Sequence, residues 1–327
     1  MTKTLQFLVF LVLQILFLPL AILGMIPAVY KEMVVSRKLG ASFTAGQAIQ
    51  PRWIMHYFGT REDEATVAFI KAFPIESHWG FLGVMGAAIV ANRICGYTPG
   101  LAKVPEPGRE TLMTFLPARV VHNDRLAKRS MERVEQVVLM GAGFDLRVLE
   151  LSRGTDLEVF ELDMDKTQQL KLATMKAAGI AYDHVTYVPI DFRHEDWMDK
   201  LIEAGFDSTK TTYFHWESVN SYLEEDVVRE TLRKMAELCA SGSVVVQDFY
   251  STTLLTGAAS SGFGSTGRIV AWMGEPWRFG IDMSKDAKAT IEALLDEYGL
   301  VVKEVVLCGA KDESTPPFYA IVEAVKE

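Results

Sequence analysis

From Glu135 to Tyr250, short runs rich in β-branched and aromatic residues alternate with stretches of helical periodicity. The runs are QVVLMGAG, LEVFELDM, VTYVPIDF, TTYFHWES and SVVVQDFY. This alternation constrains the fold strongly, because most strands are followed by an amphipathic stretch that can cross one face of a sheet before the next strand begins. The pattern predicts a doubly wound α/β domain whose parallel sheet is covered by helices.

The end of the chain breaks this alternation. LVVKEVVLCG and PFYAIVEAVK are strand-like runs joined by a short polar link, DESTPP, that leaves no room for a crossover helix. Two strands so joined pair as an antiparallel hairpin. The sequence therefore predicts a mostly parallel sheet with a C-terminal antiparallel hairpin at its edge.

The N-terminus carries no charged side chain between Lys3 and Lys31. As a helix, the 26 residues of LQFLVFLVLQILFLPLAILGMIPAVY would span about 39 Å, which exceeds a hydrocarbon core of about 30 Å. Pro19 would kink this helix without preventing insertion. We predict one transmembrane helix over residues 1–30; a cleaved signal peptide and a buried or interfacial helix are the alternatives. Flanking charges are nearly balanced and leave the orientation open.

Residues 31–129 show mostly helical periodicity, as in ATVAFIKAF and FLGVMGAAIVANRI. A second membrane segment is not expected here, because His78 and Arg93 bracket only 14 uncharged residues where roughly 20 are needed. A buried helix fits better. This segment is predicted to precede or cap the α/β domain.

Charge and cysteine content exclude some classes of protein. The net charge of −9 and pI near 5.3 offer no basic surface for nucleic acid. Cys95, Cys239 and Cys308 are far apart and lack metal-binding or disulfide spacing, so we expect ordinary reduced thiols and no metal.

Small and acidic residues follow the predicted strands. Gly141 and Gly143 close the first strand, where missing side chains let backbone N–H groups approach a ligand at a helix start. The third glycine of GxGxxG is absent, and Asp145 would repel a pyrophosphate while suiting a cationic ligand. These features count against a seat for NAD.

The next three strands end in Asp163, in Asp191 with Phe192, and in Glu217. An acid after the second strand can hold ribose hydroxyls, and an acid with an aromatic ring can hold adenine. Each acid could instead be a helix cap, a turn former or a solvated charge. Because the carboxyl ends of parallel strands converge on one crevice, the set together indicates a ligand site.

The segments QVVLMGAGFDLRVLEL, VFELDMDKTQQLK, YVPIDFR, FHWESVNSYLEEDVVRETL and GEPWRFGI resemble the leucine carboxyl methyltransferase family, with its bacterial small-molecule relatives, from about Leu116 to Glu327. Upstream of Leu116 we find no family pattern. The resemblance implies a class I methyltransferase that uses S-adenosylmethionine. Five parallel strands followed by a hairpin are also typical of Rossmann-like methyltransferases.

The resemblance implies roles for individual residues. Gly141 and Gly143 would lie at the methionine part of the cofactor, Asp163 at the ribose, Asp191 and Phe192 at adenine, and Glu217 matches the family's acid after the fourth strand. Asp145, which suits a cationic ligand, is also a candidate cofactor-binding residue. Arg119 and Asp124 in ARVVHND resemble a family segment whose arginine meets the cofactor carboxylate. Leu146 and Asn220 depart from the family pattern, which leaves the substrate class open.

The expected reaction transfers a methyl group to a carboxyl or hydroxyl of a small, lipophilic acceptor. A carboxylate needs no general base, whereas a hydroxyl would need one, for which His215 and Tyr222 are candidates. Tyr222 and Tyr250 could also line the acceptor pocket, or simply support the sheet. Residues 251–280 suit a lid over an apolar acceptor.

The predicted organisation is a membrane helix over 1–30, a helical segment over 31–129 and a methyltransferase domain over 130–327 with the lid inserted at 251–280. Because the cofactor is cytosolic, the domain is expected on the cytosolic side of a single-pass anchor. The sequence does not indicate the oligomeric state. A protein C-terminal carboxyl methyltransferase, a nicotinamide-dependent oxidoreductase and an inactive membrane-anchored scaffold are the alternatives.

Overall fold

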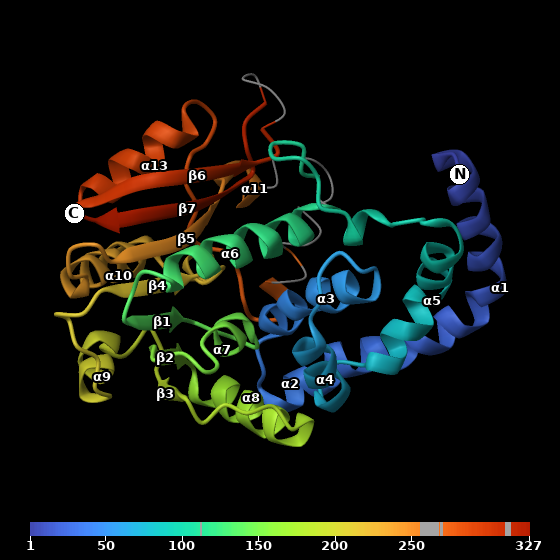
Figure 1. The fold of residues 1–327 in the computed structure, drawn as a ribbon, viewed down its shortest axis with the longest axis horizontal. Helices are drawn as coiled ribbons and strands as arrows, with labels where there is room; N and C mark the ends of the chain where they lie inside the picture. Colours follow the sequence, from blue (N-terminus) through green and yellow to red (C-terminus); the bar gives the residue numbers. More distant parts are fainter. Residues whose placement is uncertain (112, 256–267, 269–270, 311–314) are drawn as a thin grey trace.

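The computed structural model describes residues 1–327 except 112, 256–267, 269–270 and 311–314. Within the described residues, seven strands form one sheet in the order β3-β2-β1-β4-β5-β7-β6 (Figure 1). The strands are β1 (Gln136–Met140), β2 (Glu158–Asp163), β3 (Val185–Pro189), β4 (Thr212–Trp216), β5 (Val244–Tyr250), β6 (Leu300–Cys308) and β7 (Tyr319–Lys326). The strand order reverses between β1 and β4, and ligands of open α/β sheets bind at such a point.

Strands β1 to β5 pair in parallel, and β7 runs antiparallel to both β5 and β6. The predicted C-terminal hairpin is therefore confirmed. Its second strand inserts between β5 and the first, so that Tyr319 pairs with Tyr250. The register of β6 shifts between Val302 and Glu304.

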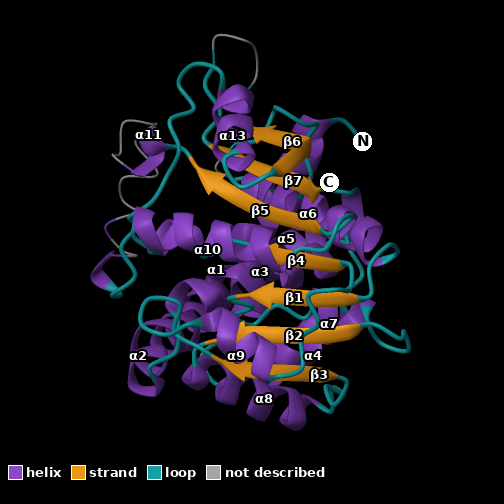
Figure 2. Cartoon of the chain, turned by 90° about the vertical axis from the view of Figure 1, so that its left-hand side faces the viewer, coloured by secondary structure: helices purple, strands orange, loops and turns teal. Residues whose placement is uncertain are grey.

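Helices cover both faces of the sheet, as a doubly wound fold requires (Figure 2). Alternate residues of β1 point to opposite faces, with Val137 and Leu139 in one core and Val138 and Met140 in the other. The first core is closed by α6 (Phe115–Met131), α7 (Arg147–Leu151) and α8 (Asp165–Ala178). The second is closed by α9 (Trp197–Glu203), α10 (Glu225–Leu238) and α13 (Ala287–Asp296).

The N-terminal part is helical, as the sequence predicts. Helix α1 (Lys3–Tyr30) continues through a π-helical turn (Lys31–Val35) into α2 (Ser36–Leu39). It is followed by α3 (Phe43–Tyr57), α4 (Glu64–Ala72) and α5 (His78–Cys95). The helical run Lys3–Leu39 is long and apolar enough to cross a membrane by length and composition. Helix α5 packs against α1 and buries Ala87, Ala88, Ile89 and Ala91.

Candidate active site

A cavity of about 920 Å³ opens over the carboxyl ends of β1 to β4. It is lined by the turn after β1, by Asp163, Asp191 and Phe192, and by Glu217 after β4. Arg119 of α6 and residues 40–52 of the N-terminal segment close the opposite side. The predicted cofactor residues therefore line one crevice together, although they come from five separate parts of the chain.

The turn after β1 needs both of its glycines. Gly141 has φ +70°, and a Cβ there would lie 2.4 Å from Val219 Cγ2. Gly143 has φ +53°, and a Cβ there would lie 3.2 Å from the Ala45 methyl of α3. Left-handed backbone and tight surroundings both favour glycine. A part of the chain almost a hundred residues upstream thus covers the turn, which the sequence did not predict.

Asp163 holds this turn in place. Its Oδ2 accepts a hydrogen bond from Gly143 N at 2.6 Å, and its Oδ1 accepts one from Met164 N at 2.7 Å. Burial raises the pKa of Asp163, although these two hydrogen bonds act to lower it. A carboxylate has about four lone-pair sites, so each oxygen can accept a further hydrogen bond from the cavity.

Glu161, two residues earlier on the same strand, does not line the cavity. Its carboxylate pairs with the fully buried Lys171 of α8 at 2.8 Å, and Lys171 also donates to the Asp145 carbonyl at 2.6 Å. Burial raises the pKa of Glu161 to about 7. Glu161 therefore stabilises the turn after β1 indirectly, because it holds Lys171, which donates to the Asp145 carbonyl.

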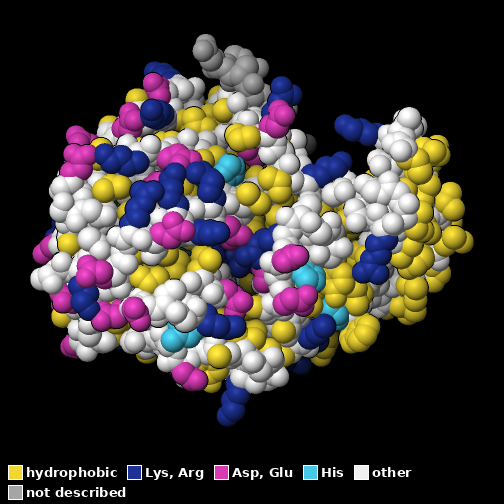
Figure 3. Space-filling view, in the orientation of Figure 1, with side chains coloured by type: hydrophobic (Ala, Val, Ile, Leu, Met, Phe, Trp, Pro, Cys, Tyr) yellow, Lys and Arg dark blue, Asp and Glu magenta, His cyan; other side chains and the backbone are white. Residues whose placement is uncertain are grey.

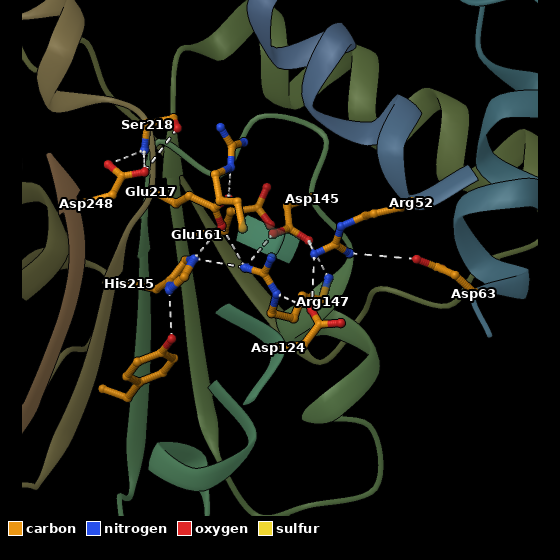
Figure 4. Close-up of polar contacts among 12 residues, drawn as sticks. Arg52, Asp63, Asp124, Asp145, Arg147, Glu161, His215, Glu217, Ser218 and Asp248 are labelled. Carbon is orange, nitrogen blue, oxygen red and sulfur yellow. Dashed lines mark hydrogen bonds and ion pairs between the residues drawn. The ribbon is translucent and has the colours of Figure 1, made fainter. Parts of the chain in front are cut away.

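A cluster of ion pairs fills the base of the cavity (Figure 4). Glu217 lies between two buried guanidiniums, with Arg119 Nε 2.7 Å from its Oε1 and Arg147 Nη1 2.9 Å from its Oε2. Burial would raise the pKa of Glu217, but Arg147 and Arg119 outweigh it and hold that pKa well below its usual range. Glu217 is consequently a carboxylate with both oxygens engaged.

Asp145 joins the same cluster. Its Oδ1 lies 2.9 Å from Arg52 Nη2, and its Oδ2 lies 3.0 Å from Arg147 Nη1. Burial opposes ionisation, but Arg147 and Arg52 lower the pKa of Asp145 to about 2. Asp145 also accepts from Arg147 N at 2.6 Å, so it serves as a local cap and as an ion-pair partner at once.

Asp124 lies at the outer edge of the cluster and does not line the cavity. It accepts from Arg147 Nε at 2.7 Å and from Arg61 Nε at 2.5 Å. Among the described residues, this cluster joins four arginines to four carboxylates, which are Arg52, Arg61, Arg119 and Arg147 with Asp63, Asp124, Asp145 and Glu217. The formal charges of the cluster therefore cancel.

His215 is bound on both ring nitrogens. Its Nδ1 lies 2.7 Å from Tyr213 Oη, and its Nε2 lies 3.0 Å from Arg147 Nη1 and 3.1 Å from Glu217 Oε2. Potential metal-ligand atoms of Asp145, His215 and Glu217 lie within 4.8 Å of one another. Arg147 Nη1 is within 3.0 Å of all three side chains, so a guanidinium holds the position that a cation would take.

The backbone after β4 is strained next to these groups. Ser218 has φ +58°, the one positive φ among the described non-glycine residues. Its N–H donates to both oxygens of the buried Asp248 at 2.9 Å, and its hydroxyl donates to Oδ2 at 3.1 Å. Tyr319 also donates to Asp248, and Asn220 donates to its carbonyl. Strain that is held by buried hydrogen bonds is common at functional sites.

At the other end of the cavity, Asp191 and Phe192 lie near the surface. The Asp191 carboxylate is paired with Arg193 at 2.8 Å and also accepts from Arg193 N. These hydrogen bonds lower the pKa of Asp191. Asp191 thus stabilises a turn with Arg193, and a bound ligand would share the Asp191 carboxylate with Arg193.

Aromatic and N-terminal residues line the remaining wall. Tyr250 stacks on Trp277 with ring centroids 5.7 Å apart, and Tyr222 lines the cavity beside them. Burial raises the pKa of both Tyr222 and Tyr250. Glu275 closes this wall, because its carboxylate accepts from Phe43 N at 3.1 Å, Thr44 N at 3.0 Å and Thr44 Oγ1 at 2.6 Å.

The predicted lid over 251–280 lies partly outside the described residues, since 256–267 and 269–270 are not described. Its described end, from Ala271, contacts α2 and the start of α3. Arg37 lies over the Trp272 ring at 4.0 Å and donates to its carbonyl at 3.3 Å. Together with the Glu275 contacts, this connects the end of the segment to the start of α3.

Sequence reasoning missed Arg52, Arg147, Asp248 and Glu275. Asp248 could have been recognised as a candidate, because it is a charged residue inside the apolar run VVVQDFY of a central strand. Arg147 could also have been recognised, as it directly follows the glycine turn. Arg52 and Glu275 could not, since nothing in their local sequence indicates which distant element they contact.

Comparison with known proteins finds a family match over the central part of the chain. The sequence profile described as leucine carboxyl methyltransferase matches residues 101–236. The match starts upstream of Leu116, so family similarity extends further toward the N-terminus than the motifs suggested.

Two curated relatives are similar to slightly more than half of the chain. A Bacillus subtilis strain 168 protein named "Putative S-adenosyl-L-methionine-dependent methyltransferase YktD" is 31% identical over 191 residues, which cover 57% of this chain and 59% of the relative. A Mycolicibacterium paratuberculosis protein named in the same way is 28% identical and covers 55% of this chain and 56% of that relative. The chain spans somewhat more than half the length of these relatives.

Among solved structures, a DUF574 family protein from Streptomyces avermitilis is similar with a TM-score of 0.48 and 16% identity, covering 66% of this chain and 85% of that one. The sequence comparisons are the more informative. Residues 101–236 match the profile of the leucine carboxyl methyltransferase family, and part of the chain is similar to proteins named as S-adenosyl-L-methionine-dependent methyltransferases.

Proposed function

We propose that the protein is an S-adenosylmethionine-dependent O-methyltransferase that acts on a small, lipophilic carboxylic acid. The observation that carries the proposal is the turn Gly141–Gly143 held by Asp163, at the point where the strand order reverses and beside a buried cluster that contains Asp145 and Glu217.

The residues of the cavity fit the cofactor in chemistry and in order. Asp163 retains lone pairs for ribose hydroxyls, and Asp191 with Phe192 can receive adenine at the outer end. Arg119 forms an ion pair with Glu217 on its Nε side, so its Nη atoms can bind the cofactor carboxylate. Asp145 and Glu217 place negative charge close to a bound sulfonium.

The cavity also has space for an acceptor. A volume of about 920 Å³ lies near the upper end of the range for small-molecule sites, which is roughly 300–1,000 Å³. When bound, S-adenosylmethionine supplies an electrophilic methyl group that needs no covalent enzyme intermediate. The protein must then align the acceptor oxygen with that group and exclude water, which the walls formed by α3 and Trp277 would do.

The state of the candidate bases favours a carboxylate over a hydroxyl acceptor. Arg147, Glu217 and Tyr213 engage both nitrogens of His215, which leaves it without a free lone pair toward the cavity. Tyr222 and Tyr250 have raised pKa values, so they stay protonated and act as hydrogen-bond donors. A carboxylate needs no base and would accept hydrogen bonds from these phenols.

Helix α1 supports the lipophilic nature of the acceptor. Arg37 lies seven residues beyond the end of α1 and lines the cavity. We propose that α1 attaches the protein to a membrane with the α/β domain on the cytosolic side. An acceptor partitioned into that membrane would meet the cavity close to the bilayer surface.

Methyl transfer to matched acceptors tests the proposal. The full chain is incubated with S-adenosylmethionine labelled in its methyl group and with pairs of long-chain or aromatic acids and the corresponding alcohols. We expect labelled methyl esters from acids and little labelled ether from alcohols. Transfer to alcohols alone would contradict the acceptor class, and modification of a protein C-terminus would favour protein carboxyl methylation. NAD binding in place of S-adenosylmethionine would favour the oxidoreductase, and cofactor binding without transfer to any acceptor would favour the scaffold.

A further inference from the structure

Helices α1 and α5 form an antiparallel pair along most of the length of α1. Near one end, Gln6 Nε2 donates to the Cys95 carbonyl at 2.7 Å, and Phe10 stacks on Tyr97 with ring centroids 4.4 Å apart. Near the other end, Gly24 lies against Gly80 and Gly83. The two helices are therefore in contact from the first turn of α1 to its last third.

Glycines bring the two backbones close together. A Cβ on Gly83 would lie 2.8 Å from the Leu20 carbonyl oxygen and 3.0 Å from Gly24 Cα, and a Cβ on Gly80 would lie 2.7 Å from the Gly24 carbonyl oxygen. Gly86 is covered by the Phe17 ring. Small residues of this kind allow the close helix packing that is characteristic of apolar surroundings.

The opposite face of α5 packs into the apolar core of the rest of the protein, which we call the body. Trp53 of α3 donates to His78 Nδ1 at 3.1 Å and contacts the Phe81 ring with centroids 5.4 Å apart. Ala88 and Ile89 are buried in the main apolar core. Helix α5 is thus a layer between the body and α1, and α1 is the outermost layer, at the right-hand edge of Figure 1.

This layering does not allow α1 to cross a bilayer with the body outside it. If α1 crossed, Cys95 beside Gln6 would lie toward the far side of the membrane. Ala102, only seven residues later, is fully buried in the short helix that packs on α3 and α6. Seven extended residues reach about 25 Å, which is less than a hydrocarbon core of about 30 Å.

The outer face of α1 is nevertheless dominated by apolar side chains from Leu5 onward. Fifteen of its large hydrophobic side chains are exposed, and none of its residues between Lys3 and Lys31 is charged (Figure 3). Exposed Leu18 and Leu20 bound an arc of about 200° around the helix, and exposed Ile15, Leu16, Ile22 and Leu23 point within it, so the apolar surface extends over more than half of the helix circumference.

A bilayer fits this surface better than a second protein. A protein interface has a polar rim around its apolar centre, and α1 has no such rim. Helices that lie in a membrane surface usually need a polar face of their own. Helix α1 does not, because α5 covers the side that faces away from lipid. Exposed basic residues at both ends, Lys3 and Arg93 at one and Lys38 at the other, suit anionic headgroups.

From this geometry we propose that α1 lies in the plane of the membrane, within one leaflet, with α5 as its inner support. The protein is then monotopic, and its N-terminus and its α/β domain are on the same side of the bilayer. This inference rests on the membrane attachment proposed above. It replaces the single-pass topology that the sequence suggested with an in-plane one.

Cysteine accessibility distinguishes the two topologies. In the full chain with Cys95→Ala, either Thr2→Cys or Ser284→Cys is introduced, the latter as a control on the exposed surface of the α/β domain. Sealed inside-out membrane vesicles from an expressing bacterium present their cytosolic face to a membrane-impermeant maleimide. We expect both cysteines to react without detergent. Reaction of Ser284→Cys alone would show that α1 crosses the membrane and would overturn the inference.

A charge on the outer face provides the second test. Leu16→Lys with Leu23→Lys should move most of the protein from the salt-washed membranes to the soluble fraction, whereas Gln169→Lys on the exposed side of α8 should not. A wild-type chain that is soluble, or that forms a dimer disrupted by these lysines, would also overturn the inference. Binding of S-adenosylhomocysteine is measured on the same preparations, so that a failure of the proposed activity is recognised separately.

Discussion

Arg147 Nη1 lies 2.9 Å from Glu217 Oε2, and both side chains are largely withdrawn from solvent at the ends of β1 and β4. This pair connects the turn after the first strand to the turn after the fourth, across the point where the strand order reverses. Because Arg147 also contacts Asp124, Asp145 and His215, one guanidinium fixes both turns of the proposed cofactor site.

Replacement of this arginine should be costly. Arg147→Met leaves three carboxylates without their shared partner, and we expect the free energy of unfolding to fall by about 3–5 kcal/mol. The measurement is urea denaturation of the full chain in detergent. Arg153→Met is the control, because Arg153 is half-exposed and, among the described residues, pairs only with Glu150, so that about 0–1 kcal/mol should be lost. Equal losses for both variants would contradict the central role of Arg147.

The glycine turn can be tested by two alanine substitutions that share the same backbone strain. Gly141→Ala puts a methyl group 2.4 Å from Val219, whereas Gly154→Ala, also at positive φ, meets nothing within 4 Å. Both should lose roughly 1–2 kcal/mol of stability from left-handed backbone. Only Gly141→Ala should weaken S-adenosylhomocysteine binding, by tenfold or more, with partial recovery in Gly141→Ala/Val219→Ala. Unchanged binding in Gly141→Ala would remove the turn from the cofactor site.

The raised pKa of Glu161 implies that the stability of the protein depends on pH. Its pKa is about 7 in the folded protein because of burial, above the usual value of 4.5. The folded state therefore binds more protons than the unfolded state between these values. The stability of the wild type relative to Glu161→Gln should then fall as pH rises from about 4.5 to 7, by up to roughly 3 kcal/mol, and change little above that. Denaturation midpoints across this range provide the measurement; a difference that grows in favour of the wild type with rising pH would show that Lys171 dominates instead.

Glu275 should affect the acceptor more than the cofactor. Glu275→Gln weakens the hydrogen bonds from Phe43 N and Thr44 N that close the wall beside Tyr222. We expect KM for the acceptor to rise several-fold while the affinity for S-adenosylhomocysteine stays within a factor of two. Steady-state kinetics and calorimetry on one preparation give both values. A parallel loss of cofactor affinity would indicate that Glu275 supports the whole site.

Much of the fold follows from local sequence pattern. The strand runs that end at Met140, Asp163 and Trp216 were recognisable from β-branched and aromatic content, and the polar link in the last hairpin ruled out a crossover helix. Residues at the carboxyl ends of parallel strands meet by topology, so Asp163, Asp191 and Glu217 could be placed in one crevice without coordinates.

The remaining features depend on contacts between distant parts of the chain. Arg52 reaches Asp145 from α3, and α5 packs along α1 through glycines whose spacing is also compatible with an ordinary buried helix. Periodicity shows that a helix has an apolar face, but not which neighbour covers it. For the same reason, length and charge alone favoured a membrane-spanning α1, and only its packing on α5 indicates an in-plane position.

Calorimetric titration with S-adenosylhomocysteine tests the central claim most directly. It uses the full chain in detergent, with NAD titrated in parallel and with Asp163→Ala and Asp163→Asn as variants. We predict micromolar binding of S-adenosylhomocysteine, no binding of NAD, loss of binding in Asp163→Ala and a smaller loss in Asp163→Asn, which keeps one oxygen for the ribose. Absence of binding by the folded wild-type chain, or tight binding of NAD instead, would contradict the assignment of this cavity to S-adenosylmethionine.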